Sequence, residues 1–294
     1  MLEPRIYTFL TLCRLGNYTR TAEELHITQP AVTQHIQYLE EQYGSKLITY
    51  SGKNMVLTPQ GELLRRHAAA MQADAIHLQT LLQNFEDSAA AVVFGATRTI
   101  GEYTMPPIMA RLMTLEPGCH ITMLVDNTYN LLKMLDSGEI QFALVEGIFD
   151  KSRYDSIPFS SEEYVAVAAA DSPLCHKEVR LEDLLGYRLL LREPGSGSRD
   201  ILEHILSEHN LGVQSFASVS VLGSISAIKE LTRRGLGITF LYKAAAEQEL
   251  KNGTLGKIEL QDFKAAHDFS FVFVQGSRHS QEYLSWAQTF AKLR

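Results

Sequence analysis

The feature that most constrains the fold is a regular alternation of apolar, strand-length runs with amphipathic helical segments over residues 89–294. The apolar runs are AAAVVFGAT, HITMLV, IQFALVEG, EEYVAVAAA, YRLLLRE, ITFLYK and FSFVFVQ. Helical segments such as RDILEHILSEH and ISAIKELTRRG lie between most of them. This alternation predicts an α/β architecture, because the intervening helices cover the faces of a largely buried sheet.

The first 57 residues have the pattern of packed helices instead. After two short helical segments and a tight link at His26-Ile27, Thr28 can cap a third helix, which tolerates Pro30 in its first turn. Apolar residues recur along this third helix at intervals of three and four and predict its buried face. They are Val32, Ile36, Leu39 and Tyr43.

Another face of the third helix carries amides and a hydroxyl instead of charges, namely Gln29, Thr33 and Gln37, with Gln34 beside them. A Gln amide matches the donor and acceptor on the major-groove edge of adenine, and Thr offers a hydroxyl and a methyl group. A short helix, a tight turn and a second helix with such residues near its start is the helix-turn-helix layout. The alternative is a solvated helix that is simply rich in Gln.

The segment KLITYSGKNMVLT reads as a β-hairpin with Lys53 at its tip, where the ammonium group can reach a DNA phosphate. A plain surface turn explains Lys53 equally well. Residues 1–60 hold five Lys or Arg and five Asp or Glu, and the whole chain has a net charge of −7. If this part of the chain binds DNA, bulk electrostatics supplies little of the affinity, and oriented helix ends or multivalency must supply it.

Residues 58–86 show apolar and small residues spaced alternately three and four apart, which is the pattern of a dimerising helix. Small residues at one position of the seam, Gly61, Ala68 and Ala75, would let two backbones approach closely. The alternative is a single helix that lies on its own domain. The predicted dimer contacts are Leu64, Ala68, Met71, Ala75, Leu78, Leu82 and Phe85.

Each half of the α/β region contains a strand that runs into small hydroxyl residues at a helix start. These are Thr97 and Thr99 in the first half and Ser196 and Ser198 in the second. The glycines that flank Ser196 allow its neighbouring N–H groups to converge on an anion at the positive end of a helix. Plain helix capping would explain one hydroxyl at each place, whereas two at each favour a ligand.

The N-terminal residues FLTLCRLGNYTRTAEELHITQPAVTQHIQYLEEQYGSKL and LTPQGELL resemble the LysR-type transcriptional regulators. The remaining chain fits as well, with EPG at 116–118, LLKMLDSGEIQFALV at 131–145 and REPGSGSR at 192–199. The resemblance implies a winged helix-turn-helix, a linker helix and an effector domain of two α/β lobes similar to type II periplasmic binding proteins. It also implies dimers that commonly pair into tetramers.

By this resemblance the chain divides into a DNA-binding domain at 1–57, a linker helix at 58–88 and an effector domain at 89–294. Within the effector domain, lobe I is expected at 89–160 and 268–294, and lobe II at 161–267. The two crossovers between the lobes, near 157–163 and 264–269, are the expected hinges.

The resemblance also transfers site residues. Gln29, Thr33 and Gln34 match base-facing positions, and Arg20 matches a position near the DNA backbone. Ile48 and Tyr50 stand where the family usually has an aromatic residue and an Arg, which predicts a weaker phosphate contact by the wing. The predicted DNA-binding residues are Arg20, Thr28, Gln29, Pro30, Thr33, Gln34, Gln37 and Lys53.

The predicted effector site combines the four hydroxyl residues with positions implied by the resemblance. Arg98 and Arg199 would supply charge or face solvent. A carboxylate, sulfate-like or phosphate-like metabolite is the expected effector, and Glu146 would favour one that also carries an amine or hydroxyl. The predicted residues are Thr97, Arg98, Thr99, Asn127, Glu146, Ser196, Ser198, Gly223 and Ser224.

Three rival functions remain open. An enzyme is disfavoured because no GxSxG, P-loop, HExxH or paired metal-ligand motif is present, so we predict no catalytic residues, metal or cofactor. A redox switch would need Cys119 and Cys175, which the resemblance places in different halves, to come together. A binding protein that has lost DNA recognition is the third rival.

The expected partners are double-stranded DNA, further copies of the chain and RNA polymerase. No apolar run reaches the roughly 18 to 20 residues of a membrane span. The N-terminus lacks the features of a signal peptide, and three widely spaced cysteines suit a reducing compartment, so we expect a cytoplasmic protein.

Overall fold

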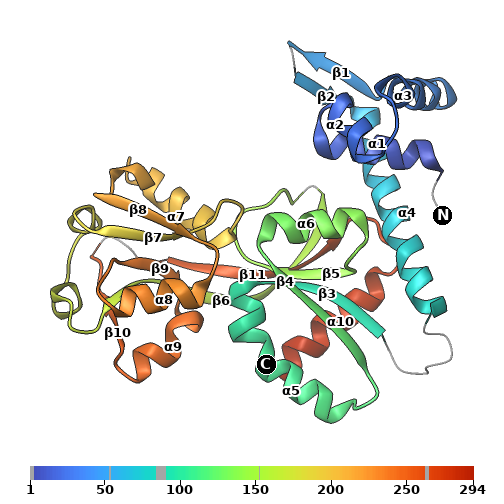
Figure 1. The fold of residues 1–294 in the computed structure, drawn as a ribbon. Helices are drawn as coiled ribbons and strands as arrows, with labels where there is room; N and C mark the ends of the chain where they lie inside the picture. Colours follow the sequence, from blue (N-terminus) through green and yellow to red (C-terminus); the bar gives the residue numbers. More distant parts are fainter. Residues whose placement is uncertain (1–2, 53, 84–90, 152, 262–264) are drawn as a thin grey trace.

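The computed structural model describes residues 3–52, 54–83, 91–151, 153–261 and 265–294. A small helical domain at the N-terminus is joined by one long helix, α4, to a larger two-lobed α/β body (Figure 1). Within the described residues, no helix combines the length and apolar composition that crossing a bilayer requires.

The N-terminal domain consists of α1 (Pro4–Leu15), α2 (Tyr18–Glu24) and α3 (Gln29–Tyr43), followed by the antiparallel hairpin of β1 (Ile48–Ser51) and β2 (Asn54–Leu57). Phe9, Leu12, Val32, Ile36 and Leu39 are buried together in its core. Three of the four residues predicted for the buried face of α3 are therefore in the core. The prediction for Tyr43 is wrong, since this last residue of α3 is 49% exposed.

Helix α4 (Pro59–Gln83) has one face packed on its own chain and another face exposed. Ala69, Ala70 and Ala73 are buried. Met71, Leu78 and Leu82 are 58%, 54% and 64% exposed, respectively. The helix thus lies on its own chain, as the alternative interpretation predicts, and still leaves an apolar stripe exposed.

Two small residues predicted for the dimer seam make close contacts within their own chain instead. Ala68 is 2% exposed and packs in the core of the N-terminal domain, so it is not available to a second chain. A Cβ atom on Gly61 would lie 2.0 Å from the Leu47 carbonyl oxygen, so this close backbone approach is also internal. Phe85 lies outside the described residues.

Lobe I is built on parallel strands. β3 (Ala91–Thr97) pairs in parallel with β4 (His120–Asp126) and β5 (Phe142–Val145), and the helices α5 (Met105–Leu115), α6 (Thr128–Ser137) and α10 (Ser280–Leu293) pack around them. A π-helical turn, η1 (Ile100–Thr104), leads into α5. Phe94, Phe142, Phe271 and Phe290 form an aromatic cluster in the core, with the Phe142 and Phe271 rings 4.5 Å apart.

Lobe II contains a parallel pair, β7 (Arg188–Arg192) and β8 (Ser218–Leu222), with α7 (Gly197–Glu208) and α8 (Ile225–Arg233). β9 (Thr239–Tyr242), α9 (Lys243–Lys251) and β10 (Leu255–Ile258) complete it, together with three short turns, η2 (Pro173–His176), η3 (Leu181–Leu184) and η4 (Val213–Ser215). The sequence did not predict β8 or β10. β8 alternates polar and apolar residues over only five positions, and β10 contains a glycine and a lysine within four.

Two long antiparallel strands run between the lobes, β6 (Tyr154–Ala169) and β11 (Ala265–Val274). The order of the main sheet is β10-β6-β11-β5-β3-β4, and β9 also pairs with β6. The β6–β11 pairing extends from Tyr154↔Val274 to Tyr164↔Ala265, with an irregularity between Phe269 and Ser270. The described parts of the expected crossovers are therefore paired strands and not loops; residue 264 lies outside the described residues.

Candidate functional site

The start of α3 is shaped by two local devices. His26 adopts the left-handed conformation with φ of 53°, which closes the tight turn after α2. Thr28 then caps α3, because its side-chain oxygen accepts a hydrogen bond from the Ala31 N–H at 3.3 Å. Pro30 occupies the first turn, where its missing N–H has no helical partner to lose.

The predicted base-facing residues share the solvent side of α3. Gln29, Gln34 and Gln37 are exposed, and Thr33 is half-buried. The side-chain amide of Gln29 donates to the Thr33 hydroxyl at 3.0 Å, and that hydroxyl donates to the backbone carbonyl of Gln29 at 3.2 Å. These bonds hold Gln29 and Thr33 in one arrangement on the surface before any partner arrives.

Arg20 lies on the preceding helix, and the wing follows α3. Arg20 is exposed, and its backbone N–H donates to Asn17 as part of the cap of α2. Lys53 lies outside the described residues. The arrangement of α2, the tight turn, α3 and the hairpin is a winged helix-turn-helix, with α3 in the place of the recognition helix.

Glu40 fixes the wing to α3. Its carboxylate accepts hydrogen bonds from the N–H groups of Leu47 and Ile48 at 3.0 and 3.4 Å, and from the Lys46 ammonium at 2.5 Å. Partial burial raises the pKa of Glu40, but these hydrogen bonds outweigh it and lower the pKa below its ordinary value. The wing therefore begins at a fixed place relative to the recognition helix.

The second site lies where the lobes meet. Thr97 is the last residue of β3, and Asn127 and Glu146 directly follow β4 and β5; the carboxyl ends of these strands lie at one edge of the parallel part of the sheet. From lobe II, Ser196 and Ser198 lie at the start of α7. These five predicted residues are all buried, with exposed fractions of 9% or less.

The two lobes are in close contact at this place. The Tyr129 N–H donates to the Gly195 carbonyl oxygen at 3.2 Å. A Cβ atom on Gly197 would lie 2.0 Å from the Glu146 carbonyl oxygen, and one on Gly147 would lie 2.4 Å from the Gly197 Cα atom. Glycine at these positions is what allows the lobes to close.

Glu146 is the central acid of this contact and is 1% exposed. Burial raises the pKa of its carboxyl to about 7, against the opposing influence of the Arg192 guanidinium and the hydroxyls of Thr99 and Thr97. Thr99 donates to Glu146 Oε1 at 3.1 Å. Among the described residues, neither Glu146 Oε2 nor the Thr97 hydroxyl has a hydrogen-bond partner, although this hydroxyl is close enough to the carboxyl to oppose the rise of its pKa.

Two charged residues that the sequence analysis did not select also lie here. Arg192 is 6% exposed and binds Glu193 through two hydrogen bonds of 2.8 and 3.0 Å. Within the described part of the chain, the remaining Nη1 atom of Arg192 has no partner. The available signal was the pair Arg192-Glu193 at the end of the apolar run YRLLLRE, where a buried strand ends in two charges.

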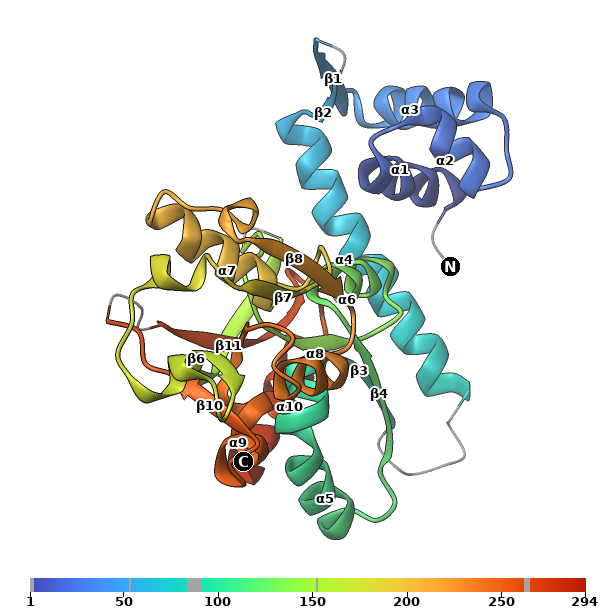
Figure 2. The same ribbon diagram turned by 60° about the vertical axis from the view of Figure 1, so that its left-hand side comes forward.

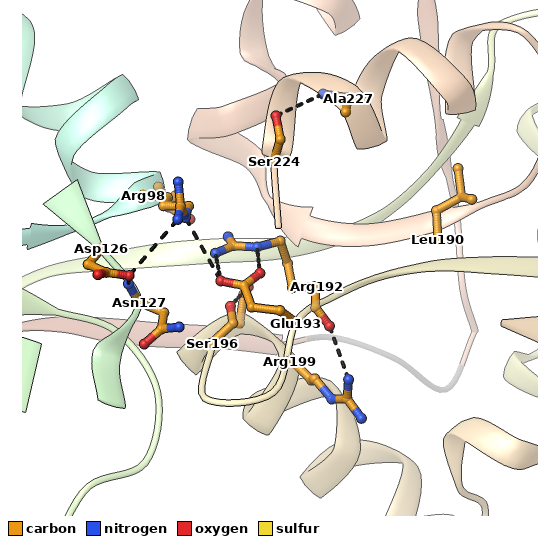
Figure 3. Close-up of polar contacts among 12 residues, drawn as sticks. Arg98, Asp126, Asn127, Leu190, Arg192, Glu193, Ser196, Arg199, Ser224 and Ala227 are labelled. Atoms are coloured by element: carbon orange, nitrogen blue, oxygen red, sulfur yellow. Dashed lines mark hydrogen bonds and ion pairs between the residues drawn. The ribbon is translucent and has the colours of Figure 1, made fainter. Parts of the chain in front are cut away.

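Arg98 lies between acidic groups from the two lobes, as Figure 3 shows. Its guanidinium nitrogens are 3.9 Å from an Asp126 oxygen and 3.8 Å from a Glu193 oxygen. Arg199 instead donates to the Arg192 carbonyl at 3.2 Å and pairs with Glu203. The positive charge of Arg98 thus lies between the two lobes, whereas Arg199 ties the first turn of α7 to the end of β7 within lobe II.

The serine hydroxyls at the starts of α7 and α8 make different contacts. Ser196 precedes α7 without capping it through its side chain, and its hydroxyl lies 3.0 Å from that of Ser198. Ser224 caps α8, since its hydroxyl accepts from the Ala227 N–H at 3.3 Å, and both Gly223 and Ser224 are exposed. Plain capping therefore explains Ser224 and does not explain Ser196 (Figure 3).

The three cysteines, all within the described residues, are free. Burial raises the pKa of each thiol, in the case of Cys13 to about 12. Low thiolate content disfavours reaction with peroxide. The described residues contain no group of three or more His, Cys, Asp or Glu side chains that could hold a metal ion.

A winged helix-turn-helix joined by a long helix to a two-lobed α/β domain, with buried polar groups between the lobes, defines a DNA-binding protein with a regulatory domain. Comparison with family models agrees. Residues 5–62 match the bacterial regulatory helix-turn-helix protein, lysR family, and residues 86–293 match the LysR substrate binding domain. The chain belongs to the LysR-type transcriptional regulator family, and it is a regulator and not an enzyme.

Individual relatives fit this assignment. The chain is 28% identical to the HTH-type transcriptional regulator CysL of Bacillus subtilis over 271 residues, covering 90% of this chain and 88% of CysL. It is 31% identical to the HTH-type transcriptional regulator YeiE of Escherichia coli over 254 residues, covering 86% of this chain and 85% of YeiE.

Solved structures share the fold. An H2O2-bound OxyR variant of Corynebacterium glutamicum has a TM-score of 0.62 at 22% identity, covering 99% of this chain and 91% of that one. The CcmR regulatory domain of Synechocystis PCC6803, in complex with 2-PG, has a TM-score of 0.60 at 21% identity, covering 69% of this chain and 98% of that one.

Proposed function

We propose that this regulator is controlled by a small effector that binds between its lobes and carries both an anionic group and a hydroxyl or amine donor. The observation that carries the proposal is the set of buried polar atoms at the lobe contact. Glu146 Oε2, Arg192 Nη1 and the Thr97 hydroxyl have no hydrogen-bond partner among the described residues. Because unpaired buried polar groups are costly, such a group of atoms is expected to have a partner that binds there.

The charges between the lobes refine the effector class. Arg98 and Arg192 face Asp126, Glu193 and Glu146, so the site is balanced only when Glu146 is neutral. A bare dianion would meet these carboxylates, whereas a donor group facing Glu146 would satisfy its free oxygen. The 2-PG bound to the related CcmR domain supports an anionic effector.

The remaining parts of the proposal concern assembly and DNA. The exposed stripe of α4, formed by Met71, Leu78 and Leu82, is proposed as the contact between two chains. The dimer, or a tetramer built from two dimers, would place its α3 helices in major grooves on one face of promoter DNA. We place this activity in the cytoplasm, where RNA polymerase is the proposed further partner.

The effector proposal is tested by thermal unfolding of the full chain with 2-PG, phosphate, sulfate, and hydroxy and amino acids. A compound that binds only the folded state raises the midpoint in proportion to its concentration. The Ser196→Ala variant should lose this rise, whereas the matched Ser224→Ala variant, altered at an exposed cap, should keep it. An equal rise in Ser196→Ala and wild type would place the ligand elsewhere.

A further inference from the structure

Helix α6 forms one wall of the interlobe site with its first turn. Asn127 caps the helix by accepting from the Asn130 N–H at 3.0 Å. The Thr128 hydroxyl donates to the Glu146 carbonyl at 2.8 Å, and the Tyr129 N–H donates to Gly195 of lobe II. A change in the distance between the lobes therefore acts directly on the first turn of α6.

The other end of α6 supports the linker helix. The Gln72 amide on α4 donates to the Ser137 carbonyl, the last of α6, at 3.0 Å. Gly138 ends α6 with φ of 75°, and a Cβ there would lie 2.8 Å from the Ile76 side chain and 2.9 Å from the Ala73 Cα atom. Figure 2 shows α4 passing beside α6 at this place.

Apolar packing joins these polar contacts into one interface. Ala69 and Ala70 of α4 pack with Leu131 and Leu135 of α6, and Leu10 of α1 packs against the same cluster. α6 has ten residues, so it spans about 15 Å as a single hydrogen-bonded rod. The linker helix continues without a break from this interface to the N-terminal domain.

We propose that Gln72 and Gly138 are positioning residues that hold α4 on α6, so that movement of the lobes is delivered to the DNA-binding helices. This inference rests on the proposed interlobe site only for the signal that starts the movement. The path runs from Gly195 to the first turn of α6, along α6 to Ser137, and through Gln72 to α4. Static packing alone would give the same contacts without transmitting movement of the lobes to α4. The quantity to be measured is therefore the coupling between the lobe contact and α4.

The experiment uses the full chain without ligand or operator. Gly197→Ala places a methyl group against the Glu146 carbonyl and so forces the lobes apart, whereas Gly223→Ala is the matched control, because its Cβ would meet only a Glu193 oxygen at 3.9 Å. Hydrogen exchange is measured in peptides from the first turn of α6 and from residues 66–76 of α4. Gln72→Ala and the Gln72→Ala, Gly197→Ala double variant complete the cycle.

We expect Gly197→Ala to raise exchange severalfold in both peptides and Gly223→Ala to raise it in neither. In the Gln72→Ala background, Gly197→Ala should still affect the first turn of α6 but should no longer change exchange in α4. An unchanged α4 in Gly197→Ala, or additive effects in the double variant, would overturn the proposal. If Gly197→Ala does not fold, Arg98→Ala removes the charge between the lobes and serves in its place.

These outcomes are independent of whether an effector is found. A negative thermal panel with a positive cycle would refute the interlobe ligand and leave the coupling through α6 intact. A ligand that raises the unfolding midpoint, together with additive effects in the double variant, would support the interlobe ligand and refute the coupling through α6.

Discussion

The Thr99 hydroxyl donates to Glu146 Oε1 at 3.1 Å and thereby joins the residues that follow two parallel strands, β3 and β5. This bond supports the ionised form of Glu146, but burial has the larger effect and raises the pKa of its carboxyl to about 7. The acid at the lobe contact thus changes its charge near neutral pH.

Glu146 should make stability fall as the pH rises from about 4.5 to about 7, the ordinary and folded pKa values. In this window the unfolded chain loses the proton and the folded chain keeps it, so ionisation favours unfolding; above pH 7 the effect is constant. Between pH 5.5 and pH 8 the wild type should lose roughly 2 kcal/mol relative to Glu146→Gln. Urea unfolding followed by the fluorescence of Trp286, the only tryptophan, measures this, and parallel pH profiles for the two proteins would contradict it.

Glu40→Ala should loosen the wing, because the N–H groups of Leu47 and Ile48 lose their acceptor. We expect the opening free energy of amides in β1 and β2 to fall by about 1–3 kcal/mol at pH 7. Since the folded pKa is lowered, the contribution of Glu40 is complete above the ordinary carboxyl pKa and is lost as the pH falls toward the folded value. Native-state hydrogen exchange gives the number; Glu41→Ala, next to it and exposed, should leave these amides unchanged.

Gln29→Ala should weaken specific DNA binding by roughly 1–3 kcal/mol per lost base contact. It also removes the hydrogen bond that the Gln29 amide donates to the Thr33 hydroxyl, while the bond from this hydroxyl to the backbone carbonyl of residue 29 remains. Duplexes that the wild-type chain selects from a random library provide the target, and fluorescence anisotropy measures affinity. Gln42→Ala, at the far end of the same helix, is the control, and equal affinity for Gln29→Ala and wild type would mean that this face of α3 does not read bases.

Leu78→Glu should separate the chains, because it places a charge in the middle of the exposed apolar stripe of α4. Sedimentation should show a change from dimer to monomer at micromolar concentration. Leu236→Glu alters a residue of similar exposure, 50% against 54%, in lobe II and should remain dimeric. A dimeric Leu78→Glu variant would assign the contact to another surface.

Much of the fold could be predicted because periodicity is a local property. All seven strands predicted for residues 89–294 are present, since each lies in a predominantly apolar run of the sequence. β8 and β10 are no shorter than β5 or β9, but polar residues or a glycine interrupt their apolar residues. Tyr43 fits the helical period and is still exposed, because the period continues past the point where the core ends. Ala68 likewise fits the spacing of a dimer seam but is buried in its own chain. Periodicity alone cannot distinguish a residue buried by a second chain from one buried within its own.

The candidate site could be predicted from the residues themselves where a hydroxyl lies between a strand and a helix start, as with Thr99 and Ser196. Glu146 entered only through the family resemblance. Arg192 was missed because a charged residue at a strand end is more often solvated, and only the lobe contact buries it. The closeness of Gly197 to Glu146 could not be predicted either, since 51 positions separate them in the sequence and only the tertiary fold brings them together.

The long pairing of β6 with β11, interrupted only by the irregularity between Phe269 and Ser270, determines how the lobes can turn. Two separate flexible loops would let one lobe rotate against the other about several independent axes. Two strands tied together by backbone hydrogen bonds allow chiefly one motion, a winding or unwinding of the ribbon about its own axis. Rotation of one lobe against the other is then confined to a single angle, the twist of this two-stranded ribbon, so that anything that turns the lobes must act through that one angle.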